Sequence, residues 1–264
     1  MSMLPTYVTG WRESADAVLA LADGLDPALA DAPTDCPDWT VQDVIAHLAH
    51  LESVMCGESS DAGADGTAEL APSYTEAGVL ERRTQTLAQV TAQLRAAITV
   101  RSEQLTYLPD DPHQPAPVTP GGIVWTWDVL LRNRCVDMWV HEQDIRRAIG
   151  RPGGMDSTAA QVVTMIFSFA MPYVLGKRVR PETGTTVRWN VTGEIPVDLA
   201  VRVGDDGRAQ RLDVIGGPVT VLSMSTETFT ILVAGRRTPD QVDVTIEGDQ
   251  ALGRSVLDAM AVTP

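Results

Sequence analysis

The 264-residue chain has few cysteines, few aromatic residues and a deficit of positive charge. Its three cysteines, Cys36, Cys56 and Cys135, show no C-x-x-C spacing and no even count, so a reducing cytoplasmic compartment is the simplest interpretation. Twenty basic against 35 acidic residues give a formal net charge of −15. Because such a surface repels phosphate backbones and anionic membranes, we expect neither a nucleic-acid partner nor a membrane partner.

A long uninterrupted apolar segment is also missing from the sequence. The most apolar run, Val162 to Leu175, contains Pro172 and is shorter than the roughly 20 residues that span a bilayer. The first residues, Met1 to Thr6, lack the basic and apolar segments of a signal peptide. The sequence therefore predicts a soluble cytoplasmic protein, and its Ala-, Val-, Asp- and Arg-rich composition is typical of high-GC organisms.

The length and the apolar content of 44% are sufficient for two domains, which we expect at residues 1–154 and 155–264. The first half has helical periodicity, with Thr40 as an N-cap and Asp43 at the third helical position. Loops are expected where Gly, Ser and Asp gather (Gly57 to Thr67) and where five prolines occur (Pro109 to Gly122). The four predicted helices are Val8 to Leu25, Thr40 to Cys56, Tyr74 to Leu105 and Ile123 to Ile149.

The second half changes its period from helical to alternating. After a helix at Asp156 to Leu175, alternation predicts strands, and Gly204 to Gly207 predicts a hairpin turn. The predicted strands are Thr185 to Val191, Val197 to Val203 and Val242 to Ile246, and further helices are predicted at Thr228 to Ala234 and Asp249 to Met260. We therefore expect a four-helix bundle followed by a small α+β domain with helices on one side of a sheet.

Three of the four histidines lie on predicted helices, where they could contribute to a metal site. His47 and His50 belong to one helix, and Asp137 and His141 are four residues apart on another. An i, i+4 spacing places two side chains on one helical face, and imidazole and carboxylate are zinc ligands. The alternative is an Asp–His hydrogen bond, or an ion pair of Asp137 with Arg134 or Arg132. Spacing alone leaves both interpretations open.

Two segments of the chain have a distinctive sequence. They run from Cys36 to Leu48, which reads CPDWTVQDVIAHL, and from Asp137 to Pro152, which reads DMWVHEQDIRRAIGRP. Both resemble the mycothiol-dependent maleylpyruvate isomerase family, within the wider DinB-like superfamily. The segments Glu227 to Arg237 and Ile246 to Asp249 are similar to that family's small sterol-carrier-like α+β domain. Together the resemblance spans nearly the whole chain.

The resemblance implies a divalent metal held by His47, Asp137 and His141, with zinc as the first candidate and nickel or iron as others. Asp137 stands where the family has a glutamate, and its shorter side chain requires a closer backbone or a bridging water. His50, one turn from His47, is expected as a second-layer or cofactor-binding residue. By the same resemblance, Arg236 would hold an anionic thiol cofactor or substrate, although a solvated surface arginine is an equal alternative.

These expectations describe a thiol-dependent metalloenzyme that uses mycothiol or a similar low-molecular-weight thiol. With three protein ligands the metal keeps an open position, where a thiol would lose its proton. The thiolate would then isomerise an activated double bond or be transferred to a small electrophile. Cys36 and Cys135 are expected to be structural. The alternatives are a non-catalytic metal-binding or sensory protein and a metal-dependent hydrolase, in each case as a monomer or homodimer.

Overall fold

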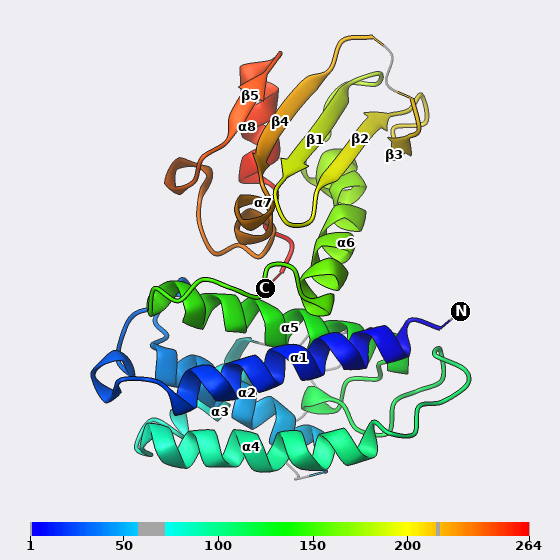
Figure 1. The fold of residues 1–264 in the computed structure, drawn as a ribbon. Helices are drawn as coiled ribbons and strands as arrows, with labels where there is room; N and C mark the ends of the chain where they lie inside the picture. Colours follow the sequence, from blue (N-terminus) through cyan, green and yellow to red (C-terminus); the bar gives the residue numbers. More distant parts are fainter. Residues whose placement is uncertain (1, 58–71, 215–216, 264) are drawn as a thin grey trace. The chain divides into compact units, whose positions relative to one another are not determined.

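The computed structural model describes residues 2–57, 72–214 and 217–263. The chain divides into two compact units, Met1–Val162 and Val163–Pro264. This division lies inside a helix, whereas the sequence led us to expect it in the loop before that helix. The first unit is helical, and the second contains a five-stranded sheet with helices, as the sequence predicts (Figure 1). The predicted loop at Gly57 to Thr67 lies largely outside the described residues.

The first unit is built on four long helices and one short one. Helix α1 packs against α5, α2 packs against α4, and α2 also contacts α3 and α5. The long proline-rich connection before α5 ends in the short 3-10 helix η2 (Pro120–Gly122). The five helices are α1 (Leu4–Asp23), α2 (Val41–Met55), α3 (Pro72–Leu80), α4 (Leu87–Gln104) and α5 (Trp127–Ala148).

Local sequence signals explain where α2 and α5 begin. The Thr40 hydroxyl accepts the Asp43 amide, and the Asp43 carboxylate accepts the Thr40 amide, so the predicted capping box is confirmed. Thr126 caps α5 by accepting the Val129 amide. These hydrogen bonds fix the residue at which each helix begins, while the packing of the helices sets which way their side chains point.

The single helix predicted from Tyr74 to Leu105 is wrong, because the structure has two helices there. Helix α3 ends at Leu80, and α4 starts after Thr86, whose hydroxyl accepts the Gln89 amide in a second capping box. A threonine followed three residues later by glutamine is a start signal, and here it outweighs the apolar periodicity that continues across the break. Leu80, the last residue of α3, is 51% exposed.

Close packing at Gly10 of α1 involves a side chain of α5 and the backbone of Ala159. A Cβ atom added at Gly10 would lie 2.9 Å from the Cys135 Sγ and 3.0 Å from the Ala159 Cα. Only glycine allows this approach without a shift of the neighbouring chain. The predicted apolar stripe of α1 is otherwise buried, including Trp11, Ala15 and Val18.

Helix α6 (Thr158–Tyr173) continues directly into the π-helix η3 (Val174–Val179). Together they form one segment, Thr158–Val179, that is long and apolar enough to cross a membrane by length and composition, and 56% of its most apolar window is buried in the protein. The expectation that this run is too short is therefore wrong, because Pro172 removes one backbone donor without ending the helix. The burial is typical of a core helix in a globular domain.

The sheet of the second unit has the strand order β3-β2-β1-β4-β5. Its strands are β1 (Thr186–Thr192), β2 (Val197–Val203), β3 (Ala209–Leu212), β4 (Thr220–Ser225) and β5 (Thr245–Glu247). Strands β1 and β4 are parallel, and the other pairs are antiparallel. Helices α7 (Thr226–Val233) and α8 (Gln250–Asp258) pack against it.

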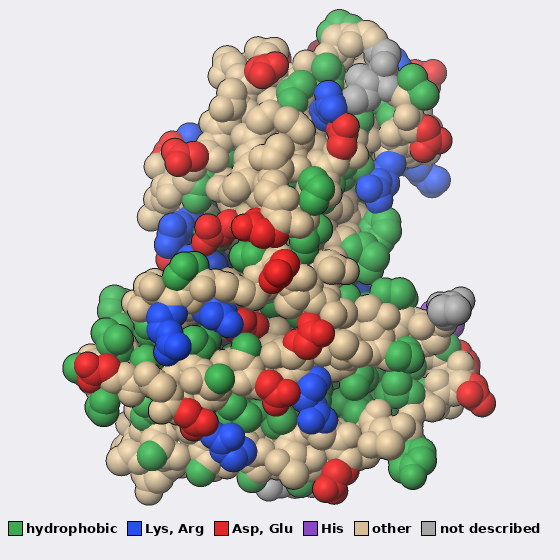
Figure 2. Space-filling model, in the orientation of Figure 1, with side chains coloured by type: hydrophobic (Ala, Val, Ile, Leu, Met, Phe, Trp, Pro, Cys, Tyr) green, Lys and Arg blue, Asp and Glu red, His purple; other side chains and the backbone are tan. Residues whose placement is uncertain are grey.

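The predicted hairpin between β2 and β3 is confirmed, since the Gly204 amide donates to the Arg208 carbonyl and Gly207 has a positive φ of 74°. The strand predicted from Val242 is shorter than expected, because only Thr245 to Glu247 pair with β4. On the face of the molecule in Figure 2, acidic and basic side chains are interspersed. The net negative charge is therefore not gathered into one patch on that face.

Candidate metal centre

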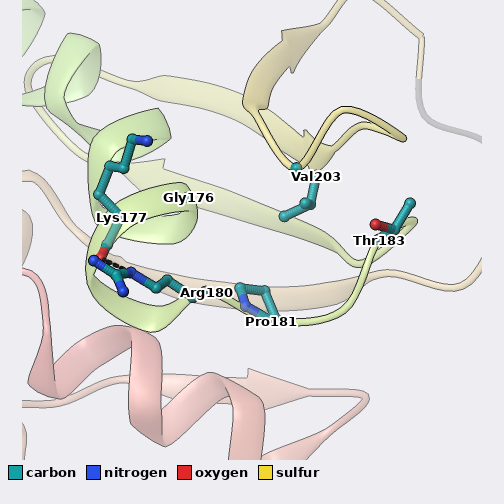
Figure 3. A pocket seen from close by; sticks show the side chains of 7 residues that line it. Gly176, Lys177, Arg180, Pro181, Thr183 and Val203 are labelled. Carbon is teal, nitrogen blue, oxygen red and sulfur yellow. Dashed lines mark hydrogen bonds between the residues drawn. The ribbon is translucent and has the colours of Figure 1, made fainter.

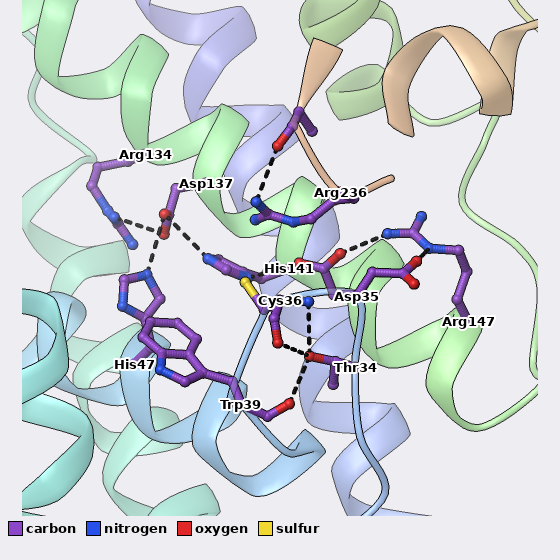
Figure 4. A network of polar contacts seen from close by, with 12 residues as sticks. Thr34, Asp35, Cys36, Trp39, His47, Arg134, Asp137, His141, Arg147 and Arg236 are labelled. Atoms are coloured by element: carbon purple, nitrogen blue, oxygen red, sulfur yellow. Dashed lines mark hydrogen bonds and ion pairs between the residues drawn. The ribbon is translucent and has the colours of Figure 1, made fainter. Parts of the chain in front are cut away.

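Helices α2 and α5 bring His47, Asp137 and His141 together, as the sequence predicts for a metal site (Figure 4). The Asp137 Oδ1 lies 3.2 Å from the His47 Nε2 and 3.6 Å from the His141 Nε2. One potential ligand atom of each residue lies within 4.8 Å of the others. Both histidines are buried, whereas the Asp137 side chain is 26% exposed.

These spacings fit the dimensions of a tetrahedral zinc site. Two ligand atoms at about 2.0–2.1 Å from one zinc ion lie about 3.3 Å apart when the geometry is tetrahedral. The two Asp137–histidine distances are close to that value. The donor set of two imidazoles and one carboxylate is one that zinc accepts, so the residue types and the two distances from Asp137 fit the ion.

His141 is oriented by a carboxylate on its other ring nitrogen. Its Nδ1 lies 3.1 Å from the Asp144 Oδ2, and Asp144 is fully buried. Arg147 donates to Asp144 at 2.6 Å and to Asp35 at 2.6 Å. Such a carboxylate keeps the proton on Nδ1 and directs the Nε2 lone pair toward a metal, as in the carboxylate–histidine–metal arrangement.

Cys36, His141 and Asp144 form a second group whose potential ligand atoms lie within 4.8 Å of one another. Asp144 is already engaged by Arg147 and His141, so this group fits the support of His141 better than a second metal site. The sequence led us to expect only a structural Cys36 in the turn before α2. The Cys36 amide donates to the Thr34 hydroxyl, which agrees with a structural residue in that turn. No sequence signal indicated that the Cys36 sulfur would lie beside His141.

Trp39 forms one wall of the histidine pair. Its ring centroid lies 5.0 Å from that of His47 and 6.0 Å from that of His141. Asp38 has a φ of 64°, and the Trp39 amide donates to the Cys36 carbonyl, so a tight turn directs the indole toward the histidines. Aspartate is among the residues that tolerate this left-handed conformation.

Charge is balanced within the site. Burial disfavours the ionised carboxyl of Asp137, but Arg134, His47 and His141 more than offset it and hold its pKa well below the usual value. Burial likewise disfavours a charged His141, yet Asp137, Asp144 and Cys36 raise the pKa of His141 to about 10. Burial lowers the pKa of His47, and the nearby Asp137 offsets that effect only in part.

His50, expected to contact a cofactor, lies outside both groups of potential ligands. It is buried beside Tyr74, with ring centroids 5.3 Å apart, and it packs closely on Gly78 of α3. Burial first and Arg82 second lower the pKa of His50 to about 4, so the ring is neutral near pH 7. A cofactor contact by His50 stays a prediction.

Arg236 follows α7 in the second unit. Gly235 has a φ of 66° and ends the helix, and the Arg236 Nη1 donates to the Ala234 carbonyl at 3.1 Å. The same unit contains a cavity of about 320 Å³ (Figure 3). None of its lining residues is a predicted site residue; they are Gly176, Lys177, Arg180, Pro181, Thr183, Val203 and Gly207.

Comparison with known proteins supports the resemblance seen in the sequence. The family model described as mycothiol maleylpyruvate isomerase N-terminal domain matches residues 11–146. Comparison with curated proteins finds no match.

Two crystal structures have a similar fold. One is the mycothiol-dependent maleylpyruvate isomerase, with 15% sequence identity and a TM-score of 0.57. The other is a histidine-to-alanine mutant of a protein with that name, with 14% identity and a TM-score of 0.58. Each comparison covers 93% of this chain and 94% of the other chain. At this identity the likeness shows the fold alone.

Proposed function

The chain belongs to the mycothiol maleylpyruvate isomerase N-terminal domain family, and on this premise we propose that it is a divalent-metal enzyme that uses a low-molecular-weight thiol. Zinc is the first candidate for the metal and mycothiol for the thiol. The reaction is cis–trans isomerisation of a small electrophilic substrate, or transfer of the thiol to it. The observation that carries this proposal is the convergence of His47, Asp137 and His141 at spacings suited to one tetrahedral ion.

Each of these side chains has a definite task. With a metal in place of their Nε2 protons, His47 and His141 would offer neutral nitrogen ligands, while Asp137 would supply a negative charge that partly offsets the cation. Asp144 holds the proton on the His141 Nδ1. Trp39 limits the access of water to the imidazoles. Three protein ligands leave a coordination position open, which is characteristic of catalytic rather than structural zinc sites.

The metal would contribute Lewis acidity, which lowers the pKa of a thiol bound next to it. The protein must then hold the rest of an anionic thiol cofactor, and the strongly acidic chain has few cations for this purpose. We propose Arg236 for that contact and the uncharged imidazole of His50 as a second cofactor-binding group. A guanidinium pairs with carboxylate or phosphate oxygens through charge-assisted hydrogen bonds of about 1.5–3 kcal/mol each.

The direct test uses the full-length chain loaded with Zn²⁺, mycothiol and maleylpyruvate, with isomerisation followed by absorbance. We expect turnover that requires both the metal and the thiol and that disappears in His141→Ala. A generic electrophile in place of maleylpyruvate detects thiol transfer. Turnover of an ester or amide without any thiol would instead indicate a hydrolase, and metal binding without any turnover would indicate a binding or sensory protein.

Arg236→Ala tests the proposed thiol contact, with Arg237→Ala as the matched control. We expect Arg236→Ala to raise the apparent KM for the thiol by about tenfold or more, the equivalent of one lost charge-assisted hydrogen bond. The metal content should not change in either variant. An equal KM in both variants and the wild type would exclude this role for Arg236.

We further propose a cytoplasmic location, which agrees with three free cysteines among the described residues. A monomer and a homodimer both fit the available observations. Sedimentation of the purified protein at micromolar concentration distinguishes these two states.

A further inference from the structure

A buried arginine links the candidate metal centre to the core of the bundle. Arg134 lies three residues before Asp137 on α5 and is only 4% exposed. Its Nη1 donates to the Asp137 Oδ2 at 2.9 Å, on the side of the carboxylate away from the atom that faces the histidines. Asp137 therefore has one oxygen bound to a guanidinium and the other directed toward His47 and His141 (Figure 4).

Glu52 of α2 holds the opposite side of the same guanidinium. Its Oε1 accepts hydrogen bonds from the Arg134 Nε at 3.1 Å and the Arg134 Nη2 at 2.7 Å. A third donor to this oxygen is the Trp11 Nε1 of α1, at 3.0 Å. Glu52 is fully buried, and Arg101 of α4 lies 3.8 Å from its other oxygen. Residues from α1, α2 and α4 thus fix one arginine of α5.

Such a network is costly to bury and is weak evidence for a contribution to stability. Taking several charges out of water costs several kcal/mol for each ion, and well-packed apolar residues often stabilise a fold equally well. The Glu52 Oε2 has no hydrogen-bond partner among the described residues, so the network is not fully satisfied as a purely structural element. A role in positioning Asp137 accounts for the presence of this charged network in the core.

We propose that Arg134, held by Glu52 and Trp11, is a positioning residue that fixes the carboxylate plane of Asp137 and leaves a single oxygen for the metal. The terminal torsion of an aspartate is broad, so an unrestrained carboxylate turns easily. This inference rests on the metal centre proposed above.

The test compares two buried arginines that surround the same glutamate. Only Arg134 touches Asp137, whereas Arg101 approaches Glu52 alone. Both are replaced by methionine in a Glu52→Gln background, so that neither variant leaves an unpaired buried carboxylate at position 52. The Zn²⁺ dissociation constant of the metal-free full-length protein is measured by competition with a chromogenic chelator, and the visible spectrum of the Co²⁺-loaded protein is recorded.

We expect Glu52→Gln/Arg134→Met to bind Zn²⁺ about 10–100-fold more weakly than Glu52→Gln, the usual cost of removing a partner of a metal ligand. Its Co²⁺ spectrum should change as well. Glu52→Gln/Arg101→Met should match Glu52→Gln in both measurements, although both double variants lose a buried cation. Equal Zn²⁺ affinity and equal spectra in the two double variants would overturn the inference.

A second substitution covers the case in which the double variant does not fold. Arg134→Lys in the otherwise natural chain keeps the charge but lacks the fork that reaches Glu52 and Asp137 together. We expect a smaller loss of Zn²⁺ affinity with a changed Co²⁺ spectrum, and an unchanged spectrum would contradict the inference. A wild-type protein that binds no Zn²⁺ at all would refute the metal centre itself, which is a different result from these.

Discussion

His47 and His50 both belong to α2, but the two regions of the helical unit around them differ in chemistry. His47 faces Asp137 and His141, next to the carboxylate that orients His141. His50, less than one turn away on α2, meets Tyr74 and the backbone of Gly78, and its Nε2 is buried without a hydrogen-bond partner among the described residues. The surroundings, and not the residue type, determine which imidazole can serve as a metal ligand.

The largest expected effect is on Zn²⁺ affinity, which should depend on the first region and not on the second. His141→Ala should weaken Zn²⁺ binding by more than about 100-fold, since the loss of a ligand exceeds the loss of a supporting partner. His50→Ala should leave the affinity within a few-fold of the wild type. Competition with a chelator measures the Zn²⁺ affinity of both metal-free variants. Similar losses of affinity in the two variants would contradict the difference between the two regions.

Asp137 variants sharpen the description of the first region. Asp137→Asn should reduce Zn²⁺ affinity by about 10–100-fold, because a neutral amide binds borderline metals poorly, while Asp137→Glu should retain the metal. Metal occupancy by elemental analysis after dialysis is the measurement. Equal occupancy in Asp137→Asn and the wild type would exclude this residue as a direct ligand.

Gly78→Ala probes the second region through packing. A Cβ atom at this position would lie 2.2 Å from two ring atoms of His50, so the ring or α3 must move. Overpacking of this kind costs about 1–3 kcal/mol of unfolding free energy. Chemical denaturation of Gly78→Ala should show that loss, and combination with His50→Ala should recover much of it. Metal affinity should stay unchanged, and a loss that His50→Ala does not reduce would contradict the contact.

The pH dependence of stability probes the second region through the titration of His50. Burial and Arg82, more than the opposing Glu81, lower the folded-state pKa of His50 to about 4, with weaker contributions from His47 and Arg134. The unfolded chain therefore binds an extra proton between about pH 6.5 and 4, and His50 reduces stability by at most about 1.4 kcal/mol for each pH unit as the pH falls through that window. The difference in slope between the wild type and His50→Gln in urea unfolding isolates this contribution, and equal slopes would refute it.

Much of the fold could be predicted from local sequence signals, whereas the three candidate ligands follow from the family resemblance, because spacing alone left the alternatives open. The Thr40–Asp43 capping box and the i, i+4 spacing of Asp137 and His141 are such signals. The start of α4 also has such a signal, the capping box of Thr86 and Gln89. We predicted one continuous helix because the apolar periodicity continues across this point. Strand β4 was not predicted, although its residues alternate between buried and less buried positions.

The ion pair of Asp137 with Arg134 was an alternative that the sequence left open, and the structure contains it. The rest of the support could not be predicted, because its partners are far apart in the chain. Glu52 and Arg134 are 82 positions apart, and neither residue lies in a recognisable motif. Cys36 likewise reaches His141 only through the fold. Spacing within one helix reveals which residues share a face, but contacts between helices depend on how the helices pack.

The most direct test of the account is the metal content of the wild-type chain. After growth with added metal, or reconstitution with Zn²⁺, elemental analysis should find about one divalent ion per chain, with a matching rise in thermal stability. His141→Ala should show neither. A wild-type protein that stays metal-free and gains no thermal stability from zinc, nickel or iron would contradict the central claim that His47, Asp137 and His141 form a metal centre.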